Sequence, residues 1–343
     1  ILSLTEERFL DGVIDGGCDV RWGRLPGLYT DDTQQSLLLC WCWDQLQRRG
    51  IDPVACPDKV ATLFLRVSHR MAQEKCTPRN SHGYFGVHRG TGGNFRTAVK
   101  TRGPVNTAGM GAAMRIGPVA PRIPFRVDVV PWCIRVSRAT TSDPMGLAAA
   151  AYMGLAAWNF AWGTGGSKVP GIGSHEYMAL DNDVQDAWDR LVSAHVLLRD
   201  SGVDALISFG NETSHKVQLG PADGYALTGV PWAIHCAEIS MLNVQRANTS
   251  TDTSPDTLIW QEVLTTACSR GGDTDTVCAM VGCLLGLARV NPPEWMRDQL
   301  GFSPESMTPE TWHPIHTERA LCVEEWNYRQ ENHVQSPLER EGG

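Results

Sequence analysis

One stretch of this sequence limits the possible folds more than any other, because residues 144–167 contain no charged side chain. The stretch is long enough to cross a membrane as a helix, but it is rich in Ala and Gly and includes Asn159. It has few of the Leu, Ile and Val residues that favour insertion into lipid. Small side chains also let neighbouring helices approach closely. We therefore predict a buried central helix over residues 147–157 and no membrane span.

Other apolar runs favour the same kind of fold. Residues 34–46 and 277–290 form runs that exceed the usual length of a strand and are rich in helix formers. Shorter helical segments are predicted at residues 60–72, 184–198 and 257–267. A regular series of alternating, β-branched strands is absent from the sequence. The sequence therefore predicts an all-α chain.

Gly- and Pro-rich stretches at residues 78–124 and 163–174 are long for connections in a compact domain, and loops of this length usually either carry function or are disordered. The composition does not shift abruptly, and no internal repeat is present. We predict a single domain over residues 1–331, followed by a polar C-terminal tail at 332–343.

Charge and cysteine content exclude several classes of protein. Lys and Arg number 30 against 38 Asp and Glu, a net charge of −8, which disfavours binding to nucleic acid or to an anionic membrane. The 11 cysteines lie in apolar runs without a C-x-x-C pair, as expected for reduced core cysteines. Residues 1–17 are acidic where a signal peptide would be basic. A cytoplasmic protein is predicted.

Two short clusters of Asp and Thr each precede a strongly apolar run, at residues 30–33 (Thr-Asp-Asp-Thr) and 273–276 (Asp-Thr-Asp-Thr). Either cluster alone is explained by helix capping, since Asp and Thr are preferred N-cap residues and the helix dipole stabilises carboxylates in the first turn. A cap needs only one oxygen acceptor, however, and each cluster offers two carboxylates and two hydroxyls.

The excess of oxygen atoms favours metal binding. Adjacent carboxylates repel each other unless a cation neutralises them, and hard oxygen ligands are those that Mg²⁺, Mn²⁺ and Ca²⁺ prefer. An EF-hand is excluded, because its sixth and twelfth positions are Cys278 and Leu284 rather than Gly and Glu. If the two clusters meet, they can hold two cations about 3.5–4 Å apart, as in two-metal hydrolytic sites.

Four motifs in this order resemble the ADP-ribosylglycohydrolase family, which includes the glycohydrolase that reactivates dinitrogenase reductase. They are TDDT at 30–33, GMGAAMR at 109–115, GYAL at 224–227 with PWA at 231–233, and GGDTDT at 271–276. The resemblance covers about residues 29–290. It implies an orthogonal multi-helix bundle with a two-metal cleft that holds two divalent cations, Mg²⁺ or Mn²⁺.

The same resemblance assigns roles to the Asp and Thr residues. The implied metal ligands are Thr30, Asp31, Asp32, Asp273, Asp275 and Thr276. Catalysis is assigned to Asp31, Asp32 and Asp275, with Asp31 or Asp32 as the general base.

Two loops of small residues are predicted to contact the substrate. Backbone N–H groups in such loops can approach a diphosphate closely, although plain loops of this composition are common, and the resemblance decides for binding. The residues are Gly90, Thr91, Gly92, Gly93, Ala108, Gly109, Met110 and Gly111. Tyr225 is added because it can stack on a base or ribose, although aromatic residues beside an apolar helix are more often part of the core.

The chain departs from the family in two places. Residues 8–20 are a degenerate form of a Gly-Asp-Ala-Leu-Gly segment, and Ser142 stands where relatives commonly have His. Unlike His, Ser does not titrate near neutral pH. The role of that His is therefore not carried over to this chain.

The implied function is metal-dependent hydrolysis of the glycosidic bond of an ADP-ribosylated protein or small ADP-ribosyl substrate, with arginine as the favoured acceptor and a monomeric enzyme. Two alternatives stay open. One is a metal-dependent hydrolase of another ADP-ribose or nucleotide derivative. The other is a non-catalytic, crystallin-like use of the scaffold, which the retention of all six ligand-type residues disfavours, because a structural role would not need adjacent unpaired carboxylates.

Overall fold

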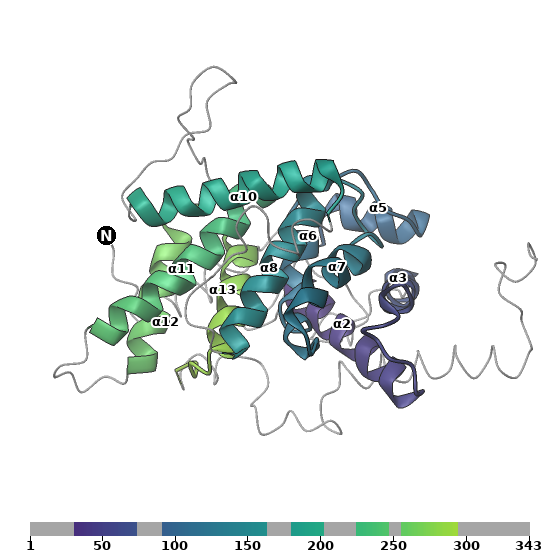
Figure 1. Cartoon of the computed structure of the whole chain (residues 1–343), viewed down its shortest axis with the longest axis horizontal. Helices are drawn as coiled ribbons and strands as arrows, with labels where there is room; N and C mark the ends of the chain where they lie inside the picture. The colour runs from purple at the N-terminus through teal and green to yellow at the C-terminus, as the bar shows by residue number, and fades with distance from the viewer. Residues whose placement is uncertain (1–30, 74–90, 163–179, 202–223, 247–254, 294–343) are drawn as a thin grey trace, which may run out of the picture.

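The computed structural model describes residues 31–73, 91–162, 180–201, 224–246 and 255–293, which form helices and short connections (Figure 1). These residues contain no strand, and two isolated β-bridges, Val105–Thr141 and Gly109–Tyr225, join loops. The prediction of an all-α fold is confirmed. The predicted tail at 332–343 and the loop at 163–174 lie outside the described residues, and the single-domain organisation stays a prediction.

All six predicted helices are present, as α2, α3, α8, α10, α12 and α13, although α13 ends at Leu287. In chain order the helices are α2 (Asp31–Arg48), α3 (Pro57–Gln73), α5 (Gly93–Thr101), α6 (Gly111–Ile116), the 3-10 helix η3 (Ala120–Arg122), α7 (Arg126–Ser137), α8 (Pro144–Trp162), α10 (Asn182–Ser201), α11 (Ala226–Arg246), α12 (Pro255–Cys268) and α13 (Thr274–Leu287).

Helix α8 is the centre of the molecule (Figure 1) and packs against α6, α7, α10, α11 and α13. Its residues 145–157 are buried without interruption, so the helix is covered on all sides. The prediction of a buried central helix is confirmed. Within the described residues, we find no helix with the length and apolar character needed to span a membrane.

Four helices were missed by the sequence analysis. The prediction that residues 78–124 form a loop is wrong for α5 and α6, which are too short to be stable alone and form through tertiary packing. Helices α7 and α11 contain Pro131 and Pro231, and each Pro removes a backbone N–H donor from the helix interior. Both helices bury most of their apolar side chains, and this burial offsets the lost hydrogen bond.

The two ends of the described chain meet in one apolar core. Helix α13 packs against both α2 and α6, and buried side chains from all the long helices join a single hydrophobic cluster. The first turns of α2 and α13 are therefore neighbours, although more than 240 residues separate Asp31 from Asp273. This packing brings the two Asp/Thr clusters to one place.

Gly146 on α8 allows a close approach between this helix and the loop before α6. A Cβ atom at position 146 would lie 2.7 Å from the carbonyl oxygen of Thr107 and 2.9 Å from Oγ1 of Thr141. We expect Gly146→Ala to destabilise the fold by about 1–3 kcal/mol, because backbone must move. As a matched control, Gly286→Ala on α13 meets nothing within 4 Å and should raise stability by roughly 0.5–1 kcal/mol. Urea denaturation of both variants tests this, and a stabilised Gly146→Ala would contradict the packing described here.

Candidate active site

A cavity of about 340 Å³ lies where several helices begin. Its lining includes the first residues of α2, α5 and α6, the residue before α13, and the two threonines at the turn before α8. The volume is in the usual range for a small-molecule site. The lining residues are Asp31, Gln35, Gly92, Gly93, Asn94, Phe95, Thr107, Gly109, Met110, Gly111, Ala112, Met114, Arg115, Thr140, Thr141, Gly224, Asp273, Asp275 and Thr276.

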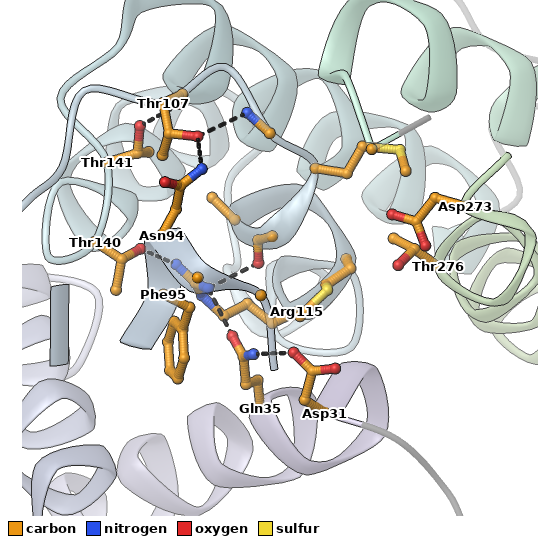
Figure 2. A pocket seen from close by; sticks show the side chains of 18 of the residues that line it. Asp31, Gln35, Asn94, Phe95, Thr107, Arg115, Thr140, Thr141, Asp273 and Thr276 are labelled. Atoms are coloured by element: carbon orange, nitrogen blue, oxygen red, sulfur yellow. Dashed lines mark hydrogen bonds between the residues drawn. The ribbon is translucent and has the colours of Figure 1, made fainter. Parts of the chain in front are cut away.

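The cavity brings the two Asp/Thr clusters together. Asp31 points in from α2 on one side, and Asp273 and Thr276 lie across from it (Figure 2), with Asp275 also in the lining. Asp32 is 3% exposed and lies behind the cavity surface rather than in its lining. The predicted ligand Thr30 and the predicted substrate contact Gly90 lie outside the described residues.

Helix capping does not account for these carboxylates. Asp273 occupies the N-cap position of α13, yet its side chain makes no capping hydrogen bond. Asp275 already lies in the first turn of that helix, as Asp31 and Asp32 do in α2, so both helices begin three residues earlier than predicted. The two residues before Asp273, Gly271 and Gly272, have φ angles of +65° and +81°, a turn that L side chains rarely adopt.

The carboxylates interact strongly with one another. The pKa of Asp31 is raised to about 7, first by burial and then by the negative charges of Asp32, Asp275 and Asp273. Burial also raises the pKa of Asp273 to about 7, with added contributions from the hydrogen bond and charge of Asp275 and from Asp32. Four carboxylates from opposite ends of the chain thus lie within interaction range. Their crowding and their all-oxygen donor chemistry fit divalent cations such as Mg²⁺ or Mn²⁺.

Arg115 holds one wall of the cavity in place. It is 2% exposed, with its guanidinium 5.0 Å from the ring centre of Phe64 and 5.6 Å from that of Phe95. Nη1 donates to Gln35 Oε1 at 2.8 Å and to the carbonyl oxygen of Gly111 at 2.7 Å. Nη2 donates to the hydroxyl of Thr140. The pKa of Arg115 is lowered to about 9, because burial lowers it by more than the negative charge of Asp31 raises it.

Gln35 links this arginine to the acidic cluster (Figure 2), because its Nε2 donates to Oδ2 of Asp31 at 2.7 Å. Arg115 therefore acts on Asp31 through Gln35 rather than by a direct salt bridge. Such a chain fixes the position of the Asp31 carboxylate without consuming its charge in an ion pair.

Another part of the cavity lining is made of backbone and small polar side chains. Asn94 Nδ2 donates to Thr107 Oγ1 at 2.8 Å, and Thr141 Oγ1 donates to the Thr107 carbonyl at 2.8 Å. Helix α5 begins here, and Gly92 at its N-cap position makes no side-chain capping hydrogen bond. Gly92 and Gly93 thus place the start of a nine-residue helix at the cavity, which favours an anionic group of a ligand.

The second predicted substrate loop pairs with the motif at 224–227. The Met110 N–H donates to the Gly224 carbonyl at 3.0 Å, and the Ala226 N–H donates to the Ala108 carbonyl at 2.8 Å. Gly224 has a φ of +85°, and a Cβ there would lie 3.4 Å from Asp273 Oδ2. This pairing holds the loop of Gly109 against the acidic cluster.

The predicted substrate contacts divide into two groups. Gly92, Gly93, Gly109, Met110 and Gly111 line the cavity. Thr91 and Ala108 do not, and Tyr225 packs, partly buried, against the hydrophobic core. The stacking role considered for Tyr225 therefore has no support from its position.

Several cavity residues were not predicted as site residues, although two of them left a signal in the sequence. Gln35 follows Asp31 by one helical turn, and Arg115 is a single cation in the apolar run Gly111–Ile116. The others carry no signal that sequence alone would separate from ordinary loop residues. They are Asn94, Phe95, Thr107, Thr140, Thr141 and Gly224.

Comparisons with known proteins agree with the motifs. A family model described as ADP-ribosylglycohydrolase matches residues 3–312. None of the curated proteins compared is similar in sequence. A solved structure titled "ADP-ribosylglycohydrolase-related protein complex" is 19% identical over 87% of this chain and 81% of that chain, with a TM-score of 0.40. Because the family model covers most of its length, the chain belongs to the ADP-ribosylglycohydrolase family.

Proposed function

We propose that this chain hydrolyses the glycosidic bond between ADP-ribose and a protein side chain, with arginine as the favoured acceptor, and that it uses two divalent cations. Membership of the family supports glycohydrolase activity. The observation that carries the proposal is the meeting of Asp31, Asp273 and Asp275 in one cavity beside loops of small residues. The arginine acceptor rests on the sequence resemblance.

The residues that would hold the cations are Asp31, Asp273, Asp275 and Thr276 in the cavity lining, with Asp32 behind them. Their donor atoms are all oxygen, which favours Mg²⁺ or Mn²⁺ over softer metals. When bound, the two cations would supply charge that orients the ribose hydroxyls and lowers the pKa of a water molecule.

Asp31 is better placed than Asp32 to act as the general base. It lines the cavity, and Gln35 fixes its carboxylate, whereas Asp32 is 3% exposed. In the proposed reaction, Asp31 takes a proton from the water that attacks the anomeric carbon. The bond from that carbon to the acceptor nitrogen breaks, and the acceptor leaves with a proton. The neighbouring carboxylates balance the positive charge that develops on the sugar.

The start of α5 in the cavity lining suits the diphosphate of the substrate. Gly92 and Gly93 lie at the start of α5, where first-turn N–H groups and the helix dipole favour negative charge. A panel of ADP-ribosylated arginine, ADP-ribosylated serine and a small ADP-ribosyl substrate, assayed with Mg²⁺ and Mn²⁺, tests the acceptor. Cleavage of the small substrate alone would favour the alternative hydrolase, and no cleavage would favour the non-catalytic use of the scaffold.

Asp275→Asn removes one negative ligand at nearly constant volume. We expect it to lower hydrolysis by at least roughly 100-fold and to remove the rise in melting temperature on adding Mg²⁺ or Mn²⁺, since bound cations stabilise the native state. The fold should persist, because the substitution relieves repulsion. Asp186→Asn, on the exposed face of α10, is the matched control and should change neither measurement. Full activity and an intact thermal shift in Asp275→Asn would refute the metal site.

The raised pKa of Asp31 and Asp273 also predicts a pH dependence of stability. A carboxyl whose folded pKa is about 7 rather than 3.8 binds its proton more tightly in the folded state. Its contribution to stability is therefore lost as the pH rises through that window. With a chelator present, the melting temperature of the wild type should fall as the pH rises from about 4 to about 7. The melting temperature of Asp31→Asn should depend less steeply on pH. If, with the chelator, the melting temperature of the wild type depended on pH no more steeply than that of Asp31→Asn, the raised pKa of the crowded carboxyl groups would be contradicted.

A further inference from the structure

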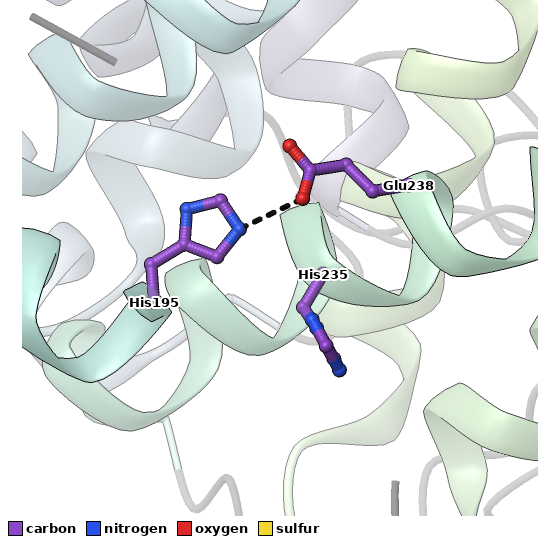
Figure 3. A group of neighbouring side chains, drawn as sticks. All are labelled: His195, His235 and Glu238. Atoms are coloured by element: carbon purple, nitrogen blue, oxygen red, sulfur yellow. Dashed lines mark hydrogen bonds and ion pairs between the residues drawn. The ribbon is translucent and has the colours of Figure 1, made fainter. Parts of the chain in front are cut away.

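A second group of polar side chains lies away from the cavity, between α10 and α11 (Figure 3). His195 comes from α10, and His235 and Glu238 lie three residues apart on α11, so they share one face of that helix. Each of the three can offer one ligand atom, and these atoms all lie within 4.8 Å of one another. None of the three lines the cavity, and the proposed hydrolysis does not use them.

His235 is the observation that calls for an explanation. Its side chain is 1% exposed, and neither ring nitrogen has a hydrogen-bond partner in the described structure. The ring packs between Trp232, 5.9 Å away between ring centres, and His195, 6.4 Å away. A buried polar group without a partner is costly and rare, and an ion or a water molecule is the usual reason that one persists.

His195 is already held in a definite orientation. The hydroxyl of Tyr152, a buried residue of α8, lies 2.6 Å from its Nδ1, and its Nε2 lies 3.1 Å from Oε2 of Glu238. Metal-binding histidines are commonly oriented in this way, with one ring nitrogen hydrogen-bonded and the other directed at the ion. Tyr152 would thus fix the ring and leave Nε2 as the ligand atom.

We propose that His195, His235 and Glu238 form a binding site for one divalent transition-metal ion of the zinc class. Two imidazoles and one carboxylate make a donor set typical of Zn²⁺, with the fourth position left to water. Two ligands on one tetrahedral zinc ion lie about 3.3 Å apart, given bonds of about 2.0–2.1 Å. The separation of 3.1 Å between His195 Nε2 and Glu238 Oε2 is close to that value.

The positive charges near the site make the Glu238 carboxylate necessary for cation binding. Arg199 and Arg270 both act on His235, and their positive charges oppose a cation, so the Glu238 carboxylate has to offset them. We therefore expect affinity to depend as strongly on Glu238 as on the two histidines.

The donor atoms of this site differ from those of the cavity, and a metal ion bound here would have a structural effect rather than a catalytic one. The cavity offers only oxygen and suits Mg²⁺ or Mn²⁺, whereas this cluster offers two nitrogens and one oxygen. An ion here would tie α10 directly to α11. Because α11 begins two residues after Gly224, which lines the cavity, the ion would stiffen the helix that directly follows this cavity residue.

The test measures metal content and melting temperature of the purified full chain, with Mg²⁺ in excess to fill the oxygen site. We expect the wild type to retain one Zn²⁺ per chain after desalting and to melt higher with Zn²⁺ than without. With Co²⁺ in place of Zn²⁺, a tetrahedral site should give strong visible absorption. His235→Phe keeps a ring in the same space and removes the two nitrogens, so it should lose all three signals without losing stability in the metal-free state.

Glu238→Gln is a second variant, which keeps the test informative if His235→Phe does not fold. Two controls should retain the bound Zn²⁺: Asp275→Asn in the cavity, and His69→Gln, whose histidine lies on α3. Retention of Zn²⁺ by both His235→Phe and Glu238→Gln would overturn the proposal, as would a wild type that takes up none. His195 and Glu238 would then form only a hydrogen-bonded chain with Tyr152. Because the readout is metal content, it is independent of hydrolysis.

Discussion

Mutual repulsion among four carboxylates is the constraint around which the rest of this structure is arranged. Packing of α13 against α2 and α6 brings the starts of two distant helices together, and each start carries two Asp residues. Burial then strengthens the repulsion, because less water screens the charges. Apolar packing between the helices has to keep the four carboxylates close together, because their repulsion favours separation. Cations at the proposed metal site would relieve this repulsion and so stabilise the fold.

Arg115 shows how the protein supports this cluster without cancelling its charge. It is the one cation among the described residues that line the cavity, and a direct salt bridge would neutralise the Asp31 carboxylate. Gln35 stands between them, so the guanidinium orients the carboxylate through a neutral amide. The arginine itself is stabilised by the rings of Phe64 and Phe95 and by hydrogen bonds to Gly111 and Thr140. The buried cation thus positions the Asp31 carboxyl group through Gln35 and does not form an ion pair with it.

The sequence predicted six of the helices and the acidic residues that line the cavity, but only part of what surrounds them. Helices such as α2 and α8 can be predicted from the sequence because apolar runs of that length usually form helices. Helices α5 and α6 were missed because they depend on contacts with α3, α2 and α8, which local patterns do not contain. Helices α7 and α11 were missed because Pro131 and Pro231 are ordinarily signs of a helix end. Thr107 and Thr141 belong to the cavity through a carbonyl hydrogen bond between segments, which no spacing rule predicts.

The distribution of charge around the cavity also bears on the direction in which a substrate would lie. Helix starts favour negative charge, so the same geometry can hold carboxylates at α2 and α13 and receive a diphosphate at α5. The three helix starts differ in their side chains. Asp residues occupy the starts of α2 and α13, whereas Gly92 and Gly93 at the start of α5 leave the first-turn N–H groups to a ligand. In ADP-ribose the terminal ribose follows the diphosphate directly. With the diphosphate at α5, the anomeric carbon would face Asp31 and Asp273 across a cavity of about 340 Å³, so that the bond to be cleaved lies where the negative charge is concentrated.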